Sequence, residues 1–378
     1  MKLKISGKLF DFFNDLKLTL KYNSVGSTFS FNAFFDPQND EHRNLFKPYT
    51  YQRVEIIDDK NNNDRLLTGT MLNNSFNDSS VKSLVSVSGY SLPGVLEDCR
   101  IPIELYPLQS DGKSLKEITE TLIKPFGLNL VISKDAQAQI DQPLGAPAAP
   151  SGFLEEVKEE FDNIIEKIYP KTTASNNQSI KSYLNELALQ RNIILSHTDA
   201  GSLLFTRARA DQKPIARFVG GISGTKMSLS TSGQQMHSSI TLQKQADLDN
   251  DNAGESTINN PFVNIFRPTT MEQSSGDDID TEQAIKNVLS SELKSIVLTI
   301  TTDRWTWEAD GKVMMKPNNI ITVHNHDIHL YQFVRFFVES IAFSGDPGKE
   351  TAILTCVLPE VYNSQTPRNI FTIPNPHD

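Results

Sequence analysis

Apolar and polar residues alternate along several short stretches near the start of the chain. TFSFNAFF (28–35) and VKSLVSVSGY (81–90) show the period of two that is typical of a strand with one buried face. YQRVEIIDD (51–59) and RLLTGTML (65–72) are two further strand-like runs, and the KNNN between them favours a turn. Residues 1–92 are therefore predicted to form a first antiparallel sheet or barrel.

From residue 93 the apolar spacing becomes that of amphipathic helices. SLKEITETLIKPFGLNLVIS (114–133) predicts a short helix that ends near Pro125 and Gly127 and is followed by a strand. SIKSYLNELALQRNIILSHT (179–198) aligns with this segment without a gap and is identical to it at four positions. The pattern predicts two copies of a helix–strand unit in a middle α/β domain spanning residues 93–201.

An insertion of about 135–175 separates the two copies. It begins with a linker rich in Pro, Ala and Gly, QPLGAPAAPSG (142–152), and continues as FLEEVKEEFDNIIEKIY (153–169), whose apolar residues share one helical face. Such a face packs on its own domain or docks onto a partner, and the pattern leaves both readings open.

Strand-like segments return between residues 202 and 245, in SLLFTRA, IARFVGG, KMSLSTS and SSITLQKQ. Residues 246–279 contain mainly Asp, Asn, Gly and Ser, a composition that predicts a long exposed loop. A second β-rich domain is therefore predicted from residues 202–245 together with 280–364, followed by a tail of residues 365–378.

Within this second domain, Asp280 and Gln283 favour the start of a helix that runs to about Leu293. The alternating segments LYQFVRFFVESIAF and TAILTCVLPEVY predict a final pair of strands, joined by the turn SGDPGKE. The predicted fold class is α+β and β-rich, with two antiparallel β-barrel domains and an intervening α/β middle domain.

Composition restricts the class of protein. With 38% hydrophobic and 22% charged residues the chain is globular, and no segment provides a signal peptide or a membrane anchor. We therefore expect assembly in the cytoplasm. Cys99 and Cys356 are too few for a disulfide framework or a zinc site built on CxxC pairs. The net charge of −10 argues against a protein that grips nucleic acid, because such binding depends on Lys and Arg.

The histidines of VHNHDIHL (323–330) are the most conspicuous candidate for a metal site. His324, His326 and His329, with Asp327 among them, lie within six positions, and on a strand the first two side chains share a face. A catalytic metal also requires a further ligand and an open position, neither of which the sequence identifies. We predict a solvated connection between two strands and no bound metal or cofactor, with a site at these histidines as the alternative.

The acidic segment DLDNDNAGE (247–255) resembles the start of an EF-hand loop. Asp247, Asp249 and Asp251 occupy the first, third and fifth positions, but Asn252 replaces the required Gly and Ile258 replaces the bidentate Glu. A solvated acidic loop is the prediction here, and calcium binding is the alternative.

Other motifs give little support to an enzyme. The sequence contains no G-x-S-x-G elbow, P-loop, H-E-x-x-H helix or G-x-G-x-x-G turn, so no catalytic residue is predicted. Trp305 and Trp307, two positions apart on a presumed strand, would face the same side. They are interpreted as anchors of a core or an interface, with stacking on sugars or bases as the alternative.

The segment from Trp305 to Tyr362 resembles the end of the baseplate hub proteins of Mu-like contractile phages, the tail hub or late control protein D-like family. The shared pattern is a Trp, a D-G turn, an apolar pair, a P-N, a long strand pair with a Gly-containing turn, and a last strand that closes with Pro and Tyr. Met315 departs from it, because a Trp is expected before the P-N. FFDPQNDEHRNLFKPYTYQRVEIIDD, GYSLPGVLEDCRIP and SYLNELALQRNIILSHTDAGSLLFTRA resemble earlier parts of the same family in the same order.

This resemblance implies a structural protein of the virion baseplate. It implies a homotrimer whose two barrels per chain form a pseudo-sixfold ring between the tail tube protein and the central spike protein. Baseplate wedge proteins, and a tape measure protein, are further expected partners. DNA would pass through the ring without specific binding, and we expect an acidic lining that repels it.

Two alternatives stay open at this point. The first is the hub of a related injection machine, such as a tailocin or a secretion system. The second is a metal-dependent hydrolase or a glycan-binding module, for which metal content and glycan binding would be the tests.

Overall fold

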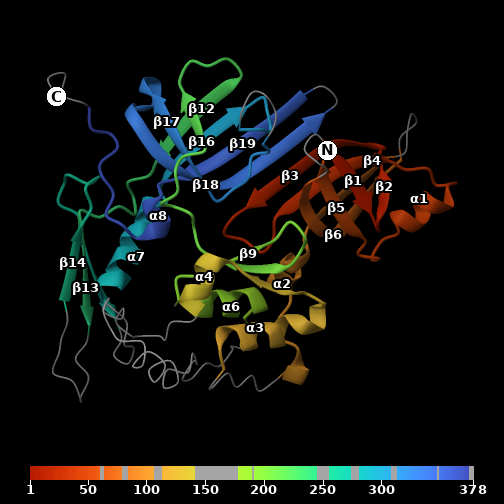
Figure 1. Ribbon diagram of the computed structural model, residues 1–378, viewed down its shortest axis with the longest axis horizontal. Helices are drawn as coiled ribbons and strands as arrows, with labels where there is room; N and C mark the ends of the chain where they lie inside the picture. Colours follow the sequence, from red (N-terminus) through yellow and green to blue (C-terminus); the bar gives the residue numbers. More distant parts are fainter. Residues whose placement is uncertain are drawn as a thin grey trace. The chain divides into compact units, whose positions relative to one another are not determined.

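The chain divides into two compact units, which are described separately. The computed structural model describes residues 1–59, 64–78, 84–105, 113–140, 178–189, 191–244, 255–273, 281–307, 313–346 and 349–373. Unit 1 comprises Met1–Arg207 and Phe343–Lys349, and unit 2 comprises Ala208–Ala342 and Glu350–Asp378 (Figure 1).

Unit 1 begins with a curled antiparallel sheet. Its strand order is β3-β4-β7-β6-β5-β1-β2, and the end of β18, which belongs to this unit, lies beside β3. Because β2, at the other end of this order, pairs with β1 alone among the described strands, the sheet is an open half-barrel rather than a closed barrel. The elements are β1 (Lys2–Ile5), β2 (Lys8–Phe10), β3 (Phe13–Lys21), β4 (Thr28–Phe34), α1 (Asp40–Leu45), β5 (Arg53–Asp58), β6 (Asp64–Asn77) and β7 (Leu84–Ser91).

The alternation of β4 shows why this sheet has one buried face. Phe29, Phe31 and Ala33 are almost completely buried, whereas the residues between them are half-buried on the other side. Two glycines make room for the first of these rings. A Cβ atom on Gly69 or Gly89 would lie 2.9 or 2.7 Å from the Phe29 ring and still closer to backbone oxygens of the neighbouring strand.

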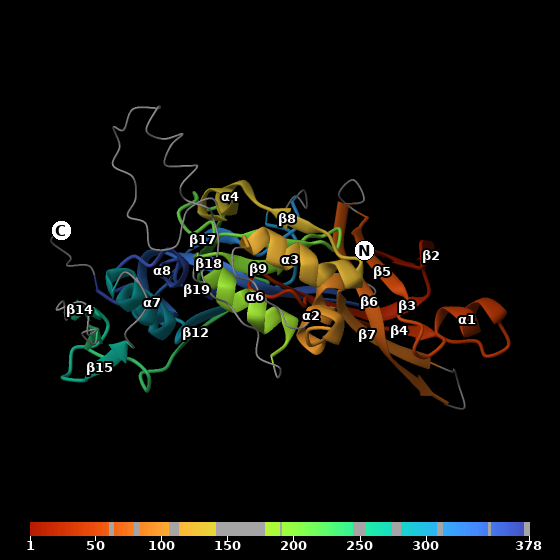
Figure 2. The same cartoon turned by 90° about the horizontal axis from the view of Figure 1, so that it is seen from below.

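Short helices and a small sheet form the middle part of unit 1. The sheet has the order β8-β10-β9, with β8 parallel and β9 antiparallel to β10. Helices α2, α3 and α6 lie together beside it (Figure 2). The elements are η1 (Leu92–Gly94), α2 (Val95–Asp98), η2 (Ile103–Leu105), α3 (Leu115–Ile123), η3 (Lys124–Phe126), β8 (Leu130–Ile132), α4 (Lys134–Ile140), α6 (Ile180–Leu189), β9 (Ile194–His197) and β10 (Leu203–Thr206).

Both predicted helix–strand pairs are present in this part. Ser114 and Glu117 form a capping box at the start of α3, and Gly127, with φ of 64°, ends the following 3-10 turn. The second pair is α6 with β9. Their apolar faces share one core with Phe205 of β10. The boundary that we predicted at residue 202 differs from the structure, because β10 pairs with β8 and β9. The predicted helix of residues 153–169 lies outside the described residues.

The main sheet of unit 2 has the order β12-β16-β19-β18-β17-β11. Its pairs are antiparallel except that β11 runs parallel to β17. The predicted final strand pair is present as β18 and β19. The elements are β11 (Ala216–Val219), β12 (Thr225–Thr231), β16 (Ile296–Thr302), β17 (Asn319–Asn325), η4 (His326–Ile328), β18 (Leu330–Asp346), β19 (Lys349–Val357) and α8 (Glu360–Asn363).

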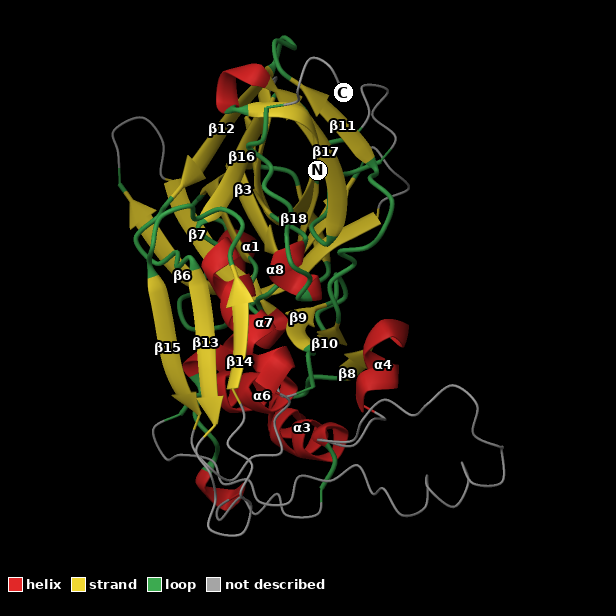
Figure 3. Ribbon diagram, turned by 90° about the vertical axis from the view of Figure 1, so that its left-hand side faces the viewer, coloured by secondary structure: helices red, strands yellow, loops and turns green. Residues whose placement is uncertain are grey.

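A second, three-stranded sheet corrects one of our predictions. The segment 246–279, predicted to be a long loop, contains β14 (Glu255–Asn259) and β15 (Pro268–Gln273) in its described residues. Both strands pair with β13 (Ser239–Lys244), and Figure 3 shows the three side by side. Helix α7 (Thr281–Leu293) ends at the predicted residue, and the proposed Asp280 cap lies outside the described residues. The short strands β14 and β15 carry few apolar side chains, so their pattern gave no strand signal.

The predicted fold class, an α+β and β-rich chain, is confirmed. In the part of the chain that the structure describes, no helix is long and apolar enough to cross a membrane.

Candidate functional site

The histidine segment forms the connection between β17 and β18. His324 lies near the end of β17, His326 begins the 3-10 turn η4, and His329 ends that turn with a left-handed backbone, φ 59°. The side chain of Asn325 accepts a hydrogen bond from the backbone N–H of Asp327 at 3.0 Å, which shapes the turn. The structure therefore has a connection between two strands at the position that the alternating pattern predicted.

The turn brings only two of the three imidazoles together. The Nε2 atoms of His324 and His326 are 3.1 Å apart, whereas the Nδ1 atom of His329 lies 3.0 Å from the hydroxyl of Tyr331. Among the described residues, no group of three or more His, Cys, Asp or Glu side chains is placed to hold a metal ion. A metal at this turn would need further ligands from water or from another chain.

The two tryptophans are buried, which favours the packing interpretation. Trp305 is 8% exposed and Trp307 6%, and the indole N–H of Trp305 donates to the backbone oxygen of Thr351 at 3.0 Å. A stacking platform for sugars or bases needs exposed rings, so that alternative is not supported.

The proposed calcium loop is described only at its end. Asp247, Asp249, Asp251 and Asn252 lie outside the described residues. Ile258, in the twelfth position, lies in β14 and pairs with Ile240.

Neither thiol has the properties of a nucleophile. Burial, and then the neighbouring Asp98 charge, raise the pKa of Cys99, and complete burial raises the pKa of Cys356. A reactive cysteine requires the opposite shift, because the thiolate is the attacking species.

Two partly buried histidine contacts had no signal in the sequence. His237 lies with its Nδ1 atom 2.6 Å from Glu292, which also accepts the His237 backbone N–H, so α7 is tied to the segment before β13. His197, at the end of β9, lies with Nε2 2.6 Å from the hydroxyl of Ser27. Burial lowers the pKa of His197. Both contacts join segments distant in the chain, which local patterns do not reveal.

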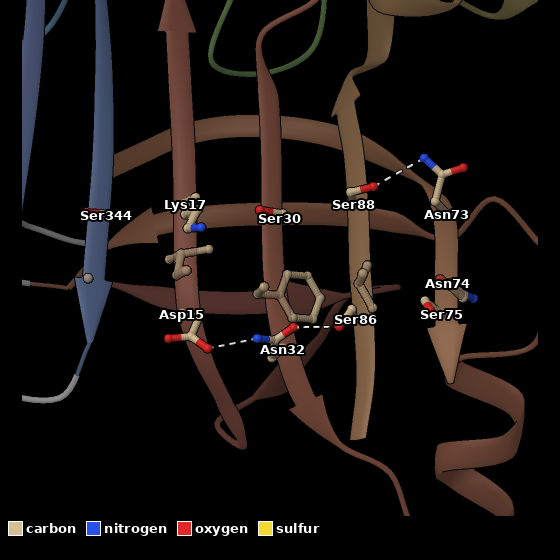
Figure 4. Close-up of a pocket in the computed structure, with 14 residues that line it drawn as sticks. Asp15, Lys17, Ser30, Asn32, Asn73, Asn74, Ser75, Ser86, Ser88 and Ser344 are labelled. Atoms are coloured by element: carbon tan, nitrogen blue, oxygen red, sulfur yellow. Dashed lines mark hydrogen bonds between the residues drawn. The ribbon is translucent and has the colours of Figure 1, made fainter. Parts of the chain in front are cut away.

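A broad polar surface covers the outward side of β3, β4, β6 and β7 in unit 1 (Figure 4). Ser30 of β4 pairs across the sheet with Lys17 of β3 and Ser88 of β7, and Ser88 pairs in turn with Asn73 of β6. We call this surface the polar face of unit 1. It consists of Asp15, Lys17, Ser30, Asn32, Asn73, Ser75, Ser86 and Ser88.

Side chains of the polar face of unit 1 bond to one another across strands. Asn32 donates to Asp15 at 2.8 Å and accepts from the Ser86 hydroxyl at 2.7 Å. Asn73 donates to Ser88 at 3.2 Å. Figure 4 shows these three contacts as dashed lines across neighbouring strands. Cross-strand pairs of this kind stabilise a sheet. They also satisfy polar groups that would otherwise form hydrogen bonds with water or with another molecule.

The polar face was visible in the sequence only as the polar half of an alternating pattern. Serine and asparagine on a solvated strand face are ordinary residues, and none of them forms a motif. Their arrangement as one continuous surface depends on the pairing of β6, β7, β4 and β3, which the sequence alone did not give.

Comparison with known proteins gives the fold a context. No protein-family profile matches the sequence, and no curated protein matches it. Among solved structures, the chain is similar to the 43 kDa tail protein of prophage MuSo2 from Shewanella oneidensis, with a TM-score of 0.73, 18% identity, and coverage of 96% of this chain and 99% of that one. It is similar to a tail protein from Neisseria meningitidis MC58, with a TM-score of 0.70, 16% identity, and coverage of 97% and 98%.

A third similar structure is a component of the Escherichia coli type VI secretion system that is itself similar to phage T4 tail proteins. Its TM-score is 0.53, with 8% identity and coverage of 100% of this chain and 81% of that one. At these identities the comparisons establish the fold alone. That fold is shared with phage tail proteins and with a type VI secretion component, in agreement with the resemblance drawn from the sequence.

Proposed function

We propose that the chain is the structural hub of a contractile phage tail. Three copies would form a ring that joins the tail tube to the central spike and leaves a channel for DNA. The observation that carries the proposal is the similarity of fold over 96% of this chain and 99% of a prophage tail protein. The hub of a tailocin or a secretion system is the second candidate, because a secretion-system component also shares the fold.

The internal organisation of the chain supports a ring with more repeats than subunits. Unit 1 and unit 2 each contain one large, mainly antiparallel sheet in addition to a three-stranded one. Three chains would therefore supply six large sheets, as an adaptor beneath a sixfold tube requires. Head-to-tail contacts close into a ring when the rotation between copies is one third of a turn.

Exposed apolar side chains in unit 1 support contact with other chains. Phe12 is 68% exposed, Tyr49 86%, Tyr51 60% and Leu9 52%, all before β5. We take these side chains as candidate contacts with other copies, which would make them parts of an interaction surface. In unit 2, β12 has β16 as its partner among the described strands, so its other edge is available for pairing.

Sedimentation and electron microscopy of the purified protein test the proposal. The expected result is a trimer at micromolar concentration, seen as a ring with threefold symmetry and a bore wide enough for duplex DNA. The double variant Phe12→Ser with Tyr49→Ser should shift the protein toward monomer while leaving its circular dichroism unchanged. A wild-type protein that stays monomeric, or a ring too narrow for a duplex, would refute the hub assignment.

Genome neighbours separate the two candidates. Capsid genes beside this one would indicate a phage, and their absence beside tube, sheath and spike genes would indicate a tailocin or a secretion system.

A further inference from the structure

Unit 2 repeats the arrangement of the polar face of unit 1 with different strands. In its main sheet, Leu298, Ile300 and Leu354 are completely buried on one side. On the other side, Thr299 of β16 pairs with Ser228 of β12 and with Thr355 of β19. We call this side the polar face of unit 2. Its hydroxyl-bearing positions are Ser228, Ser230, Thr299, Thr301, Thr351 and Thr355.

Both polar faces contain few charged residues. The outward positions of β4 and β7, and those of β6 from Thr70 onward, carry none, and in unit 1 the charges stay on β3, at Asp15, Lys17 and Lys21. Lys226 is the charged residue among the outward side chains of β12, β16 and β19 that the structure describes, and Lys349 is the first residue of β19. Charged residues make up 22% of the whole chain, and few of them lie on these two faces. The net charge of −10 is therefore carried by other surfaces.

This chemistry fits a surface along which a polyanion such as DNA moves without being bound. A surface that grips DNA clusters Lys and Arg against the phosphates, and one that docks a protein presents apolar side chains. Here the outward groups are mainly hydroxyls and amides. The exposed apolar exceptions are the pair Phe34 and Leu84 in unit 1, at the end of β4 and the start of β7, and Ile353 in unit 2. In unit 1 three cross-strand hydrogen bonds already use the polar groups. Donors that are paired within the sheet are not free to hold a phosphate.

We infer that the polar faces of unit 1 and unit 2 form the wall of the DNA channel. The inference rests on the proposed function and specifies which surface of each unit meets the DNA. It replaces the acidic lining that we expected from the net charge with a neutral, hydroxyl-rich one. Duplex DNA would move past it with neither strong attraction nor strong repulsion.

The position of the two faces is tested first, with spin labels in the assembled ring. Single cysteines replace Ser88 in unit 1 or Thr299 in unit 2, in a Cys99→Ala background, because Cys356 is completely buried. Asn44→Cys, on the exposed side of α1, is the control. Three symmetric labels on a channel wall should be closer to one another in double electron–electron resonance than the three control labels.

The outcomes separate the inference from the proposed function. Label separations at residues 88 and 299 that equal or exceed those at residue 44 would place the faces outside the channel and overturn the inference, even though a ring is present. If no ring forms, the hub assignment fails first.

The chemistry of the wall is tested with a charge variant. Ser88→Lys with Thr299→Lys adds six lysines to a trimeric ring, and Ser88→Thr with Thr299→Ser is the matched control that keeps both hydroxyls. The control and wild-type rings should retain no short duplex DNA in 50 mM salt. The lysine ring should retain it, and its affinity should fall by about a thousandfold between 50 and 200 mM salt if all six lysines meet phosphates.

Two results would contradict the proposed chemistry of the channel wall. One is a lysine ring that assembles and still fails to retain DNA. The other is equal retention by Asn44→Lys, which would mean that any added lysine, wherever it lies, produces the effect.

Discussion

The histidine turn of unit 2 and the polar face of unit 1 differ in how they appear in the sequence and in what the fold makes of them. The turn concentrates three imidazoles within six residues, yet the structure brings only His324 and His326 together. The polar face is assembled from common residues on four strands, such as Ser30 and Ser88, which pairing makes continuous. Residue type draws attention to a site, but strand pairing determines which side chains form a surface.

The largest expected effect comes from truncating a buried side chain on the apolar side of the sheet, opposite the polar face of unit 1. Phe31 is 1% exposed beneath Ser30 and Asn32, and Phe31→Ala should lower the free energy of unfolding by about 3–5 kcal/mol, since it leaves a cavity in a packed core. Ser30→Ala, one residue away on the polar side, is the control and should change it by less than about 0.5 kcal/mol. Chemical denaturation measures both, and equal losses would contradict the division between the two sides.

The same alternation explains how far the sequence could predict the fold. Phe29, Phe31 and Ala33 alternate with polar residues, so β4 and its buried side were predictable. The strands β14 and β15 were not, because they carry few apolar residues and are held by pairing with β13. Local pattern determines which face of a strand is buried, whereas the partners of a strand depend on contacts between distant segments.

Candidate chemistry was predictable to a smaller extent. The position of the histidine turn followed from the strands on either side, and the burial of Trp305 and Trp307 agrees with the packing interpretation. The contact of His237 with Glu292 and that of His197 with Ser27 join residues 55 and 170 positions apart. No spacing rule in the sequence predicts such contacts.

The second prediction contrasts an isolated histidine with the conspicuous cluster. Burial lowers the pKa of His197, so the folded state favours its neutral form. Its contribution to stability is therefore complete above the unfolded pKa of about 6.5 and decreases as the pH falls below it, by at most about 1.4 kcal/mol per pH unit. His197→Gln should make the unfolding free energy less dependent on pH between 7 and 5. Identical slopes for wild type and variant would show that this histidine is not the source.

A smaller effect is expected within the polar face of unit 1. Asn32 bridges Asp15 and Ser86, so Asn32→Ala removes two hydrogen bonds and should cost about 1 kcal/mol, because water reaches this half-buried site and replaces part of the loss. Asn73→Ala removes the one bond to Ser88 from an exposed position and should cost less. A loss of several kcal/mol for Asn32→Ala would contradict this expectation. It would mean that the hydrogen bonds of Asn32 to Asp15 and Ser86 are a main source of the stability of the sheet.

The smallest effect is expected where the sequence is most conspicuous. His326 is exposed and His324 half-buried, so the double variant His324→Ala with His326→Ala should change the unfolding free energy by less than about 0.5 kcal/mol. Elemental analysis of the purified wild-type protein should find no stoichiometric zinc, iron or nickel, because two imidazoles provide half of a tetrahedral ligand set. His329→Ala is the matched control, since that ring contacts Tyr331 instead of the pair. One metal ion per ring, lost in the double variant and kept in the control, would show that the missing ligands come from other copies of the turn. The difference between the two regions would then depend on assembly. The histidine turn would become a metal site only when copies of the turn from different chains meet, just as the polar face forms only when distant strands pair.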